Sequence, residues 1–402
     1  MKKRMIMVLV CALLLGTAAG CAAKEKENAA DIDAGSEEGI ELKIAFWGAS
    51  GEEEALKEAA KGMEDTVDGI ASIVWEQFPS VEEFYDTLPT ESAIGRVPDI
   101  VMLNNEEQKS LIAAGFLEPL EETPNAQDYI GNVLDEWQYE GQLYGLPGTA
   151  APALFIVNED MWKEAGLTDY PASFEQVYED AKVLKTHGFT PICIDISNLY
   201  HVTQHLQAFG GGWNGGTDID TAENKAAVAY ILKMFDEGLA VTAKDMGKSW
   251  DGEVFAAGEC AMSTGGTWYM GAMKDSPTIN YTMLPIPRTD EGNGKTLHSY
   301  GYAVMSGSQN KKTAQQAVKY LVREEAQKIR MEVTGDCPAL VSLQDAYYEL
   351  YPQLDFMKEE LNSTQSFDYP VDSTLMDKVR EKLEQRIYGQ NKELTPEAIL
   401  GN

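Results

Sequence analysis

The sequence is short of positive charge. Only 32 of its 402 residues are Lys or Arg, against 65 Asp and Glu, and the formal net charge is −33. Nucleic-acid binding depends on basic side chains that neutralise phosphates, and anionic membrane surfaces attract basic segments for the same reason. The charge balance therefore argues against both classes of partner. A neutral or cationic ligand is the easier expectation.

Cysteine is also scarce, with five in the whole chain. Two of them lie within the first 21 residues, and the others are Cys193, Cys260 and Cys337. An odd number at such wide spacing does not indicate a disulfide framework. We expect each of the three to be a small buried apolar residue, as free cysteines commonly are.

Catalytic signatures are missing as well. The chain has four histidines, and His201 and His205 lie one helical turn apart, but the segment HVTQH lacks the Glu of a zinc-protease motif and no third ligand is evident. We expect ordinary helix residues there and no metal or cofactor. No nucleophile elbow, P-loop or dinucleotide fingerprint occurs. Carboxylates are abundant, so a secreted glycan-cleaving enzyme with an acid–base pair stays open as an alternative, but nothing singles out two of them.

Long apolar runs are confined to the N-terminus. MKKR is followed by MIMVLVCALLLGTAA, and this stretch ends Ala18-Ala19-Gly20-Cys21. The ending resembles a bacterial lipobox, with Ala18 where Leu is usual. The resemblance implies that residues 1–21 are a lipoprotein signal peptide and that Cys21 carries lipid. Residues 22–39 are polar and charged, which predicts a disordered tether that holds the protein at the outer face of a bacterial membrane.

The rest of the chain alternates strand-like and helix-like segments. Apolar runs such as LKIAFW (42–47), PDIVML (98–103) and PICIDI (191–196) are each followed by a longer amphipathic stretch. This alternation predicts βαβ units in an α/β fold with a mainly parallel sheet, and the length predicts two domains. Residues 312–329 read as one long helix.

Tryptophans follow strands and glycines in a way that indicates ligand binding. Trp47 ends a predicted strand, Trp213 lies among glycines, Trp250 precedes an acidic residue, and Trp268 comes after Gly-Gly in FAAGECAMSTGGTWYM. Each could be core. Alternatively, an indole face can cover the apolar face of a sugar ring while Asn, Asp and Tyr bind its hydroxyls. On this second interpretation the two glycines leave bare backbone beside which a sugar ring can lie.

Four segments in a fixed order resemble the family 1 extracellular solute-binding proteins, which are maltose-binding-protein-like lipoproteins of ABC sugar importers. The four segments are PDIVMLNNEEQKSLIAAGFLEPL, GQLYGLPGTAAPALFIVNEDMWKEAGLTDYPASFEQV, FAAGECAMSTGGTW and GYAVMSGSQNKKTAQQAVKYL. The resemblance implies a two-lobed periplasmic-binding-protein-like fold of type II, with a hinge between the lobes. It further implies a monomer that is not an enzyme, binds a carbohydrate reversibly and delivers it to the importer's permease subunits. A non-sugar solute bound by the same fold is the alternative.

The resemblance also implies where the lobes divide. Lobe 1 would comprise 40–149 plus 303–345, and lobe 2 would comprise 150–302 plus 346–402. The chain would cross between them near Thr149–Ala151, Tyr300–Met305 and Ser342–Leu350.

Family binding roles carry over by position. Trp268 matches the stacking tryptophan, while Asn198 and Tyr200 stand where relatives place a hydroxyl-binding carboxylate and a stacking aromatic. Ala151 stands where maltose binders carry Glu, which makes a maltodextrin ligand less expected. The full set of expected ligand-binding residues is Trp47, Asn104, Asn105, Thr149, Asn198, Tyr200, Trp213, Trp250, Trp268, Tyr300 and Tyr369.

Overall fold

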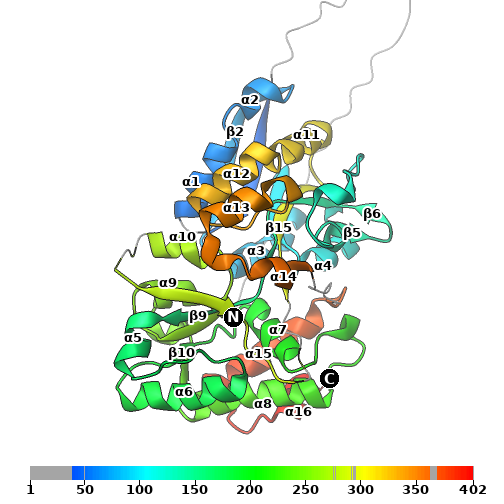
Figure 1. The fold of residues 1–402 in the computed structure, drawn as a ribbon. Helices are drawn as coiled ribbons and strands as arrows, with labels where there is room; N and C mark the ends of the chain where they lie inside the picture. Colours follow the sequence, from blue (N-terminus) through cyan, green and yellow to red (C-terminus); the bar gives the residue numbers. More distant parts are fainter. Residues whose placement is uncertain are drawn as a thin grey trace, which may run out of the picture. The chain divides into compact units, whose positions relative to one another are not determined.

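The alternation of strands and helices produces two separate sheets, each with its own helices (Figure 1). The computed structural model describes residues 39–48, 50–274, 276, 278–290, 292, 296–362 and 369–401. The predicted signal peptide, Cys21 and nearly all of the predicted tether lie outside these residues. Within the described part, no helix combines the length and the apolar character needed to cross a bilayer.

The first sheet has six strands in the order β2-β1-β3-β15-β4, with β7 also paired to β15. Its strands are β1 (Ile40–Trp47), β2 (Ile70–Phe78), β3 (Ile100–Asn104), β4 (Leu117–Glu118), β7 (Gly145–Pro147) and β15 (Tyr300–Met305). The first three are parallel, as predicted, whereas β15 runs antiparallel to β3. Since β3 and β15 are entirely buried, their near-continuous apolar sequences are those of a sheet covered on both faces.

The second sheet has five strands in the order β11-β10-β12-β9-β13. They are β9 (Leu154–Asn158), β10 (Ile192–Cys193), β11 (Ala240–Val241), β12 (Met262–Gly265) and β13 (Tyr281–Pro285). Along β9, Leu154 and Ile156 belong to one apolar cluster, while Phe155 and Val157 belong to another. The alternation follows from the two-residue period of a strand, and it buries both faces of this sheet.

Helices cover both sheets. They are α1 (Ser50–Ala59), α2 (Met63–Thr66), α3 (Val81–Ala93), α4 (Gln108–Ala113), α5 (Glu159–Glu164), α6 (Phe174–Thr186), α7 (Leu199–Ala208), α8 (Ala222–Asp236), α9 (Asp251–Ala256), α10 (Tyr269–Lys274), α11 (Lys311–Leu321), α12 (Glu324–Val333), α13 (Gln344–Leu350), α14 (Met357–Asn362), α15 (Thr374–Ile387) and α16 (Pro396–Leu400). Short 3₁₀ turns are η1 (Ala126–Asp128), η2 (Asp135–Trp137), η3 (Asn214–Gly216), η4 (Lys244–Met246), η5 (Val341–Leu343) and η6 (Pro352–Leu354). Segments far apart in sequence meet: α12 packs on α1, and α16 packs on α8 (Figure 1).

The helix predicted over 312–329 is two helices. Arg323 is extended, with φ −61° and ψ 159°, and it separates α11 from α12. Its guanidinium donates to the carbonyls of Ala59 and Tyr320. These bonds fix the break at the point where α12 turns to pack on α1. Amphipathic periodicity continues across Arg323, so the sequence pattern alone does not show the break.

Two short strands mark where the chain passes between the sheets. β8 (Ala151–Pro152) lies between β7 and β9, and β14 (Leu297–His298) lies between β13 and β15. The two pair with each other in antiparallel register, Ala151 opposite His298. The crossing expected at Thr149–Ala151 therefore lies beside β14. This strand begins about three residues before Tyr300–Met305, the segment expected to form the second crossing.

Two expected lobe boundaries change accordingly. β15 pairs with the first sheet over its whole length, so a division at 302/303 falls inside a strand of that sheet. The segment Ser342–Leu350 also lies on the first lobe, because the Tyr347 hydroxyl donates to the carbonyl of Gly335 just beyond α12. Neither sequence pattern distinguishes a strand or helix within a lobe from one that crosses between lobes. A remaining β-hairpin joins β5 (Gln138–Tyr139) to β6 (Gln142–Leu143).

The three cysteines Cys193, Cys260 and Cys337 are free and fully buried, as predicted.

Candidate functional site

Three aromatic rings from distant segments meet where the two sheets' crossing strands lie. Trp268 follows β12, Tyr200 lies in the first turn of α7, and His298 ends β14. The ring centroids are 5.4 Å apart for Trp268 and Tyr200, 4.6 Å for Trp268 and His298, and 4.7 Å for Tyr200 and His298. We call these three residues the aromatic cluster. Trp268 is half-buried, so part of its indole is open.

The glycines before Trp268 make room for the chain's own rings. A Cβ on Gly266 would lie 2.0 Å from the Trp268 ring, and a Cβ on Gly265 would lie 2.2 Å from the Tyr269 ring. No real Cβ is found so close to another atom. The interpretation of Gly-Gly as space left for a ligand is thus replaced by a local one, because the indole itself folds back over the bare backbone.

A buried carboxylate adjoins the aromatic cluster. Glu106 follows β3 and is 3% exposed, and its Oε1 lies 2.8 Å from Nδ1 of His298. Its other oxygen, Oε2, has no hydrogen-bond partner among the described residues. A buried carboxylate oxygen without a donor is costly, so this atom is an acceptor available to a bound hydroxyl.

Asn104 and Asn105 are both engaged within the protein. The Asn104 side-chain oxygen accepts from the Tyr85 hydroxyl at 2.8 Å. Asn105 donates to the carbonyl of Leu297 at 3.0 Å and accepts from the N–H of Ser299 at 2.8 Å. Asn105 thereby ties the end of β3 to the crossing strand β14. In this conformation it positions His298, and its predicted role as a ligand-binding residue stays a prediction.

A small cavity lies between groups from both lobes. Its lining residues are Val81, Tyr85, Asn104, Glu106, Glu107, Ser197, Asn198, Leu199, Tyr200 and Arg380. Its volume is about 30 Å³, roughly the share of one liquid water. Residues of the two lobes therefore lie close together around this cavity. Trp47 is half-buried against Phe84 at 5.3 Å and against Tyr85, a residue of the cavity lining, at 6.0 Å.

Burial, together with the charges at this contact, perturbs one carboxyl group. Burial raises the pKa of Glu107 to about 7, and the charges of Asp377 and Glu106 add to the rise while Arg380 opposes it. Glu107 is thus partly protonated near neutral pH, which lowers the repulsion among the carboxylates where the lobes meet.

Asn198 has a structural role that was not predicted from the sequence. It is the N-cap of α7, and its side-chain oxygen accepts from the N–H of Tyr200 at 3.0 Å. The cap fixes the first turn of α7 and with it the Tyr200 ring. Asn198 also lines the small cavity with Asn104 and Tyr200, and the Tyr200 ring contacts Trp268. The ligand-binding role of these residues stays a prediction.

Of three other predicted residues, Trp213 and Tyr369 are buried and Trp250 is half-buried. Trp213 is 2% exposed and its Nε1 donates to Thr203 Oγ1 at 2.7 Å, so no face of the indole is open, and the interpretation of it as a stacking platform does not fit this position. Tyr369 is 1% exposed, beside Thr203. Trp250 is half-buried and edge-on to Tyr269 at 5.4 Å, and the Tyr269 ring in turn lies 6.5 Å from that of Trp268.

Thr149 and Tyr300 belong to the crossing. Thr149 Oγ1 accepts from the N–H of Tyr300 at 3.1 Å, and the Tyr300 hydroxyl donates to Asp336 at 2.7 Å. The Arg330 guanidinium lies 4.5 Å from the centre of the Tyr300 ring. Both predicted residues therefore bond to the first lobe's own framework near the crossing and are buried.

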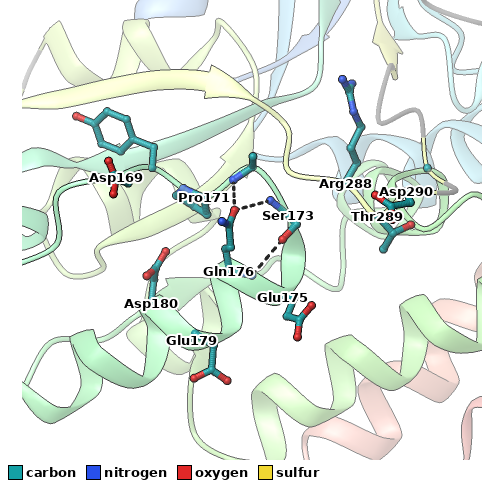
Figure 2. Close-up of a pocket in the computed structure, with 13 residues that line it drawn as sticks. Asp169, Pro171, Ser173, Glu175, Gln176, Glu179, Asp180, Arg288, Thr289 and Asp290 are labelled. Carbon is teal, nitrogen blue, oxygen red and sulfur yellow. Dashed lines mark hydrogen bonds between the residues drawn. The ribbon is translucent and has the colours of Figure 1, made fainter.

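A larger hollow exists on the second lobe and differs in character (Figure 2). Its volume is about 1030 Å³, and it is lined by the loop before α6, the start of α6 and residues 288–290 and 292. Gln176 is held there by the N–H groups of Ala172 and Ser173. Figure 2 shows the carboxylates of Glu175, Glu179 and Asp180 spread along α6 and pointing apart, so they do not converge on one ligand.

Sequence reasoning missed Glu106 and His298. Glu106 comes directly after Asn104 and Asn105, which were both expected to bind ligand, so the sequence NNEE already placed a carboxylate at the end of this strand. His298 gave no signal, because its place depends on the pairing of β14 with β8.

Comparisons with known proteins agree on a family. Residues 58–354 match the family model of bacterial extracellular solute-binding proteins. The galactooligosaccharide-binding protein of Bacillus subtilis (strain 168) is 24% identical, over 85% of this chain and 82% of its own length. A maltooligosaccharide ABC transporter solute-binding lipoprotein of Streptococcus pneumoniae (strain R6) is 26% identical, over 63% and 62%.

A solved structure extends the likeness to the fold. An ABC substrate-binding protein from Listeria monocytogenes, in complex with cycloalternan, superposes with a TM-score of 0.76 at 20% identity, covering 90% of this chain and 96% of that one. The fold expected from the sequence, two α/β lobes with crossings, is thus confirmed. Because the family model matches most of its length, this chain belongs to the bacterial extracellular solute-binding proteins.

Proposed function

We propose that this protein is the carbohydrate receptor of an ABC importer, which binds a mono- or oligosaccharide reversibly between its lobes and catalyses no reaction. The observation that carries the proposal is the aromatic cluster beside the buried Glu106 carboxylate. Family membership and relatives named for oligosaccharide binding support it.

The chemistry of the cluster suits a sugar. The open part of the Trp268 indole can cover the C–H face of a pyranose ring, a contact worth about 1–3 kcal/mol by analogy with base stacking. Glu106 Oε2 can accept from a hydroxyl, since it has no donor among the described residues. A hydrogen bond to a charged acceptor contributes about 1.5–3 kcal/mol. Stacking supplies affinity, and the carboxylate supplies discrimination among hydroxyl patterns.

Binding must begin with opening. The cavity between the lobes holds about 30 Å³, whereas ligand pockets of small molecules span roughly 300–1,000 Å³. A sugar therefore enters a conformation in which the lobes have separated about the crossings near Thr149 and His298. It favours reclosure because the groups that contact it come from both lobes.

Location and partners follow from the same proposal. Cys21 would carry the lipid that tethers the protein outside the cytoplasmic membrane, and this lipid would be the protein's only membrane contact. The closed, loaded monomer would dock on the permease subunits of the importer. The lipobox-like sequence and the similarity to the pneumococcal solute-binding lipoprotein of an ABC transporter support this arrangement.

A calorimetric titration tests the proposal. The chain is titrated with galactooligosaccharides, maltooligosaccharides, cycloalternan and chito-oligosaccharides, with and without Glu106→Gln. We expect one class to bind and the substitution to weaken it about tenfold to hundredfold. Glu179→Gln, in the hollow on α6, is the matched control and should bind as wild type.

Two results would redirect the assignment. If no sugar binds while another solute does, the same fold serves a non-sugar ligand. If sugar is cleaved during the titration, as product analysis by mass spectrometry would show, the protein is a glycan-cleaving enzyme.

A further inference from the structure

A second polar cluster lies inside the second lobe, apart from the proposed sugar site. Asp195 follows β10, His201 lies in α7, and Asp251 begins α9. One nitrogen or carboxylate oxygen from each lies within 4.8 Å of the others. The three residues are 7%, 2% and 1% exposed, so all are more than nine-tenths buried.

The atoms of His201 and Asp251 that face away from the cluster are held by neighbours. His201 Nδ1 lies 3.1 Å from Thr264 Oγ1. Asp251 Oδ2 accepts from Ser263 Oγ at 3.0 Å and from the Tyr269 hydroxyl. In the tautomer whose Nδ1–H donates to Thr264, His201 has its Nε2 lone pair on the side of Asp251. Such outer bonds orient the ligands in protein metal centres.

Asp195 is oriented in the same way. Its Oδ1 accepts from the backbone N–H groups of Ser197 at 3.1 Å and Asn198 at 3.3 Å. These bonds come from the turn that leads into α7, so the same turn that positions Tyr200 also positions this carboxylate.

The spacing of His201 and Asp251 fits a small divalent cation, and Asp195 offers an oxygen within 4.8 Å of both. His201 Nε2 and Asp251 Oδ1 are 3.5 Å apart, with no hydrogen bond between them. Two ligands of a tetrahedral zinc ion, each about 2.0–2.1 Å from the metal, are separated by roughly 3.4 Å. In that tautomer the Nε2 of His201 and the two carboxylates all present acceptors to one another, so a cation between them relieves their mutual repulsion and the cost of burying charge.

We propose that Asp195, His201 and Asp251 bind one divalent transition-metal ion of the Zn²⁺ class within the second lobe. One nitrogen and two oxygen donors suit a borderline ion, whereas Mg²⁺ and Ca²⁺ require more oxygen ligands. The proposal is independent of the sugar assignment. It also revises the expectation for HVTQH: His201 pairs with carboxylates from other elements and not with His205, whose Nδ1 contacts the carbonyl of His201.

The position of the site gives the metal a structural consequence. Asp251 holds the Tyr269 hydroxyl, and Tyr269 is the residue next to Trp268. His201 follows Tyr200, and their rings are 5.8 Å apart. A bound ion would therefore restrain the backbone that carries Trp268 and Tyr200, two of the three residues of the aromatic cluster.

The test is metal binding by the full chain, purified in detergent and stripped with chelator. Zn²⁺ is titrated against a chromophoric competitor, and Co²⁺ is titrated with absorption spectra recorded. We expect one equivalent of Zn²⁺ at micromolar affinity or tighter, unaffected by millimolar Mg²⁺. The Co²⁺ complex should show the intense visible bands of four-coordinate cobalt. His201→Gln and Asp251→Asn should each weaken Zn²⁺ binding at least thirtyfold.

His205→Gln is the matched control, because His205 is equally buried on the same helix but lies outside the cluster. It should bind Zn²⁺ as wild type does. The proposal is overturned if wild type binds less than a fifth of an equivalent, or if His201→Gln leaves binding intact. Should His201→Gln fail to fold by circular dichroism, the wild-type Co²⁺ spectrum decides, since weak octahedral bands would mean that only surface groups bind.

Discussion

Trp213 and Trp268 look alike in the sequence and differ in the fold. Both follow glycines, and both were interpreted as platforms for a sugar ring. In the structure Trp213 is buried, and its Nε1 donates to Thr203. Trp268 is half-buried, so part of its indole is exposed beside Tyr200 and His298. Glycine beside tryptophan therefore indicates that a ring lies close to backbone. It does not indicate which side of the ring faces solvent.

Trp213→Ala gives the largest expected effect and tests the buried half of the comparison. Removal of a fully packed indole should lower the free energy of unfolding by about 3–5 kcal/mol, measured by urea denaturation. Sugar affinity, measured well below the melting temperature, should stay within twofold of wild type. A variant that keeps its stability and loses binding would place Trp213 in the sugar site.

The contrast between the two tryptophans also marks what sequence could predict. The predicted strands LKIAFW and PDIVML became β1 and β3, and PICIDI became β10 over Ile192–Cys193 alone, because each is an apolar run between turn signals, a local property. Asp99, one residue before β3, shows the limit of such local patterns, because its Oδ2 accepts from the N–H of Lys43 in the neighbouring strand β1 at 2.9 Å.

The aromatic cluster could be predicted only in part. Trp268 and Tyr200 were named from family resemblance, but His298 depends on a strand pair, β8 with β14, whose two-residue members carry no pattern of their own. The cluster of Asp195, His201 and Asp251 assembles residues from three elements for the same reason. Exposure, pairing across long loops and convergence of side chains are tertiary properties, so they are absent from any local window.

The pH dependence of stability sharpens the comparison on the side of Trp268. Tyr200, which contacts Trp268, lines the small cavity together with the ionisable residue Glu107. The pKa of Glu107 is raised from 4.5 to about 7 in the folded protein. A raised carboxyl pKa contributes stability that is fully present below pH 4.5 and is lost as pH rises through about 7. Wild type should lose on the order of 2 kcal/mol between pH 5 and pH 8 through this group, at about 1.4 kcal/mol per unit.

The charges that face Glu107 are Asp377, Glu106, Asp86 and Arg380, and they remain in Glu107→Gln. That variant should therefore lose less stability than wild type over the same interval, as urea denaturation at each pH would measure. Equal slopes for the two proteins would mean that Glu107 titrates normally and is not buried by the lobe contact in solution.

Trp268→Ala tests the open half of the comparison. It should weaken sugar binding at least tenfold, about 1.4 kcal/mol, while the melting temperature of the free protein stays nearly unchanged. Trp268→Phe retains a ring face and should recover part of the affinity in the same calorimetric titration. A fall in melting temperature comparable to that of Trp213→Ala, with no separate binding defect, would erase the difference between the two tryptophans.

Substitutions at Asn198 should give the smallest effect. They distinguish a role in capping α7 from a direct contact with the sugar. Asn198→Ala removes the acceptor for the N–H of Tyr200 and should cost about 1 kcal/mol of stability. Asn198→Ser restores a cap but not the amide. If Asn198 acts only by positioning Tyr200, Ser should recover both stability and sugar affinity. If its amide contacts the sugar as predicted, Ser should recover stability alone, because a hydroxyl offers one donor where the amide offers two.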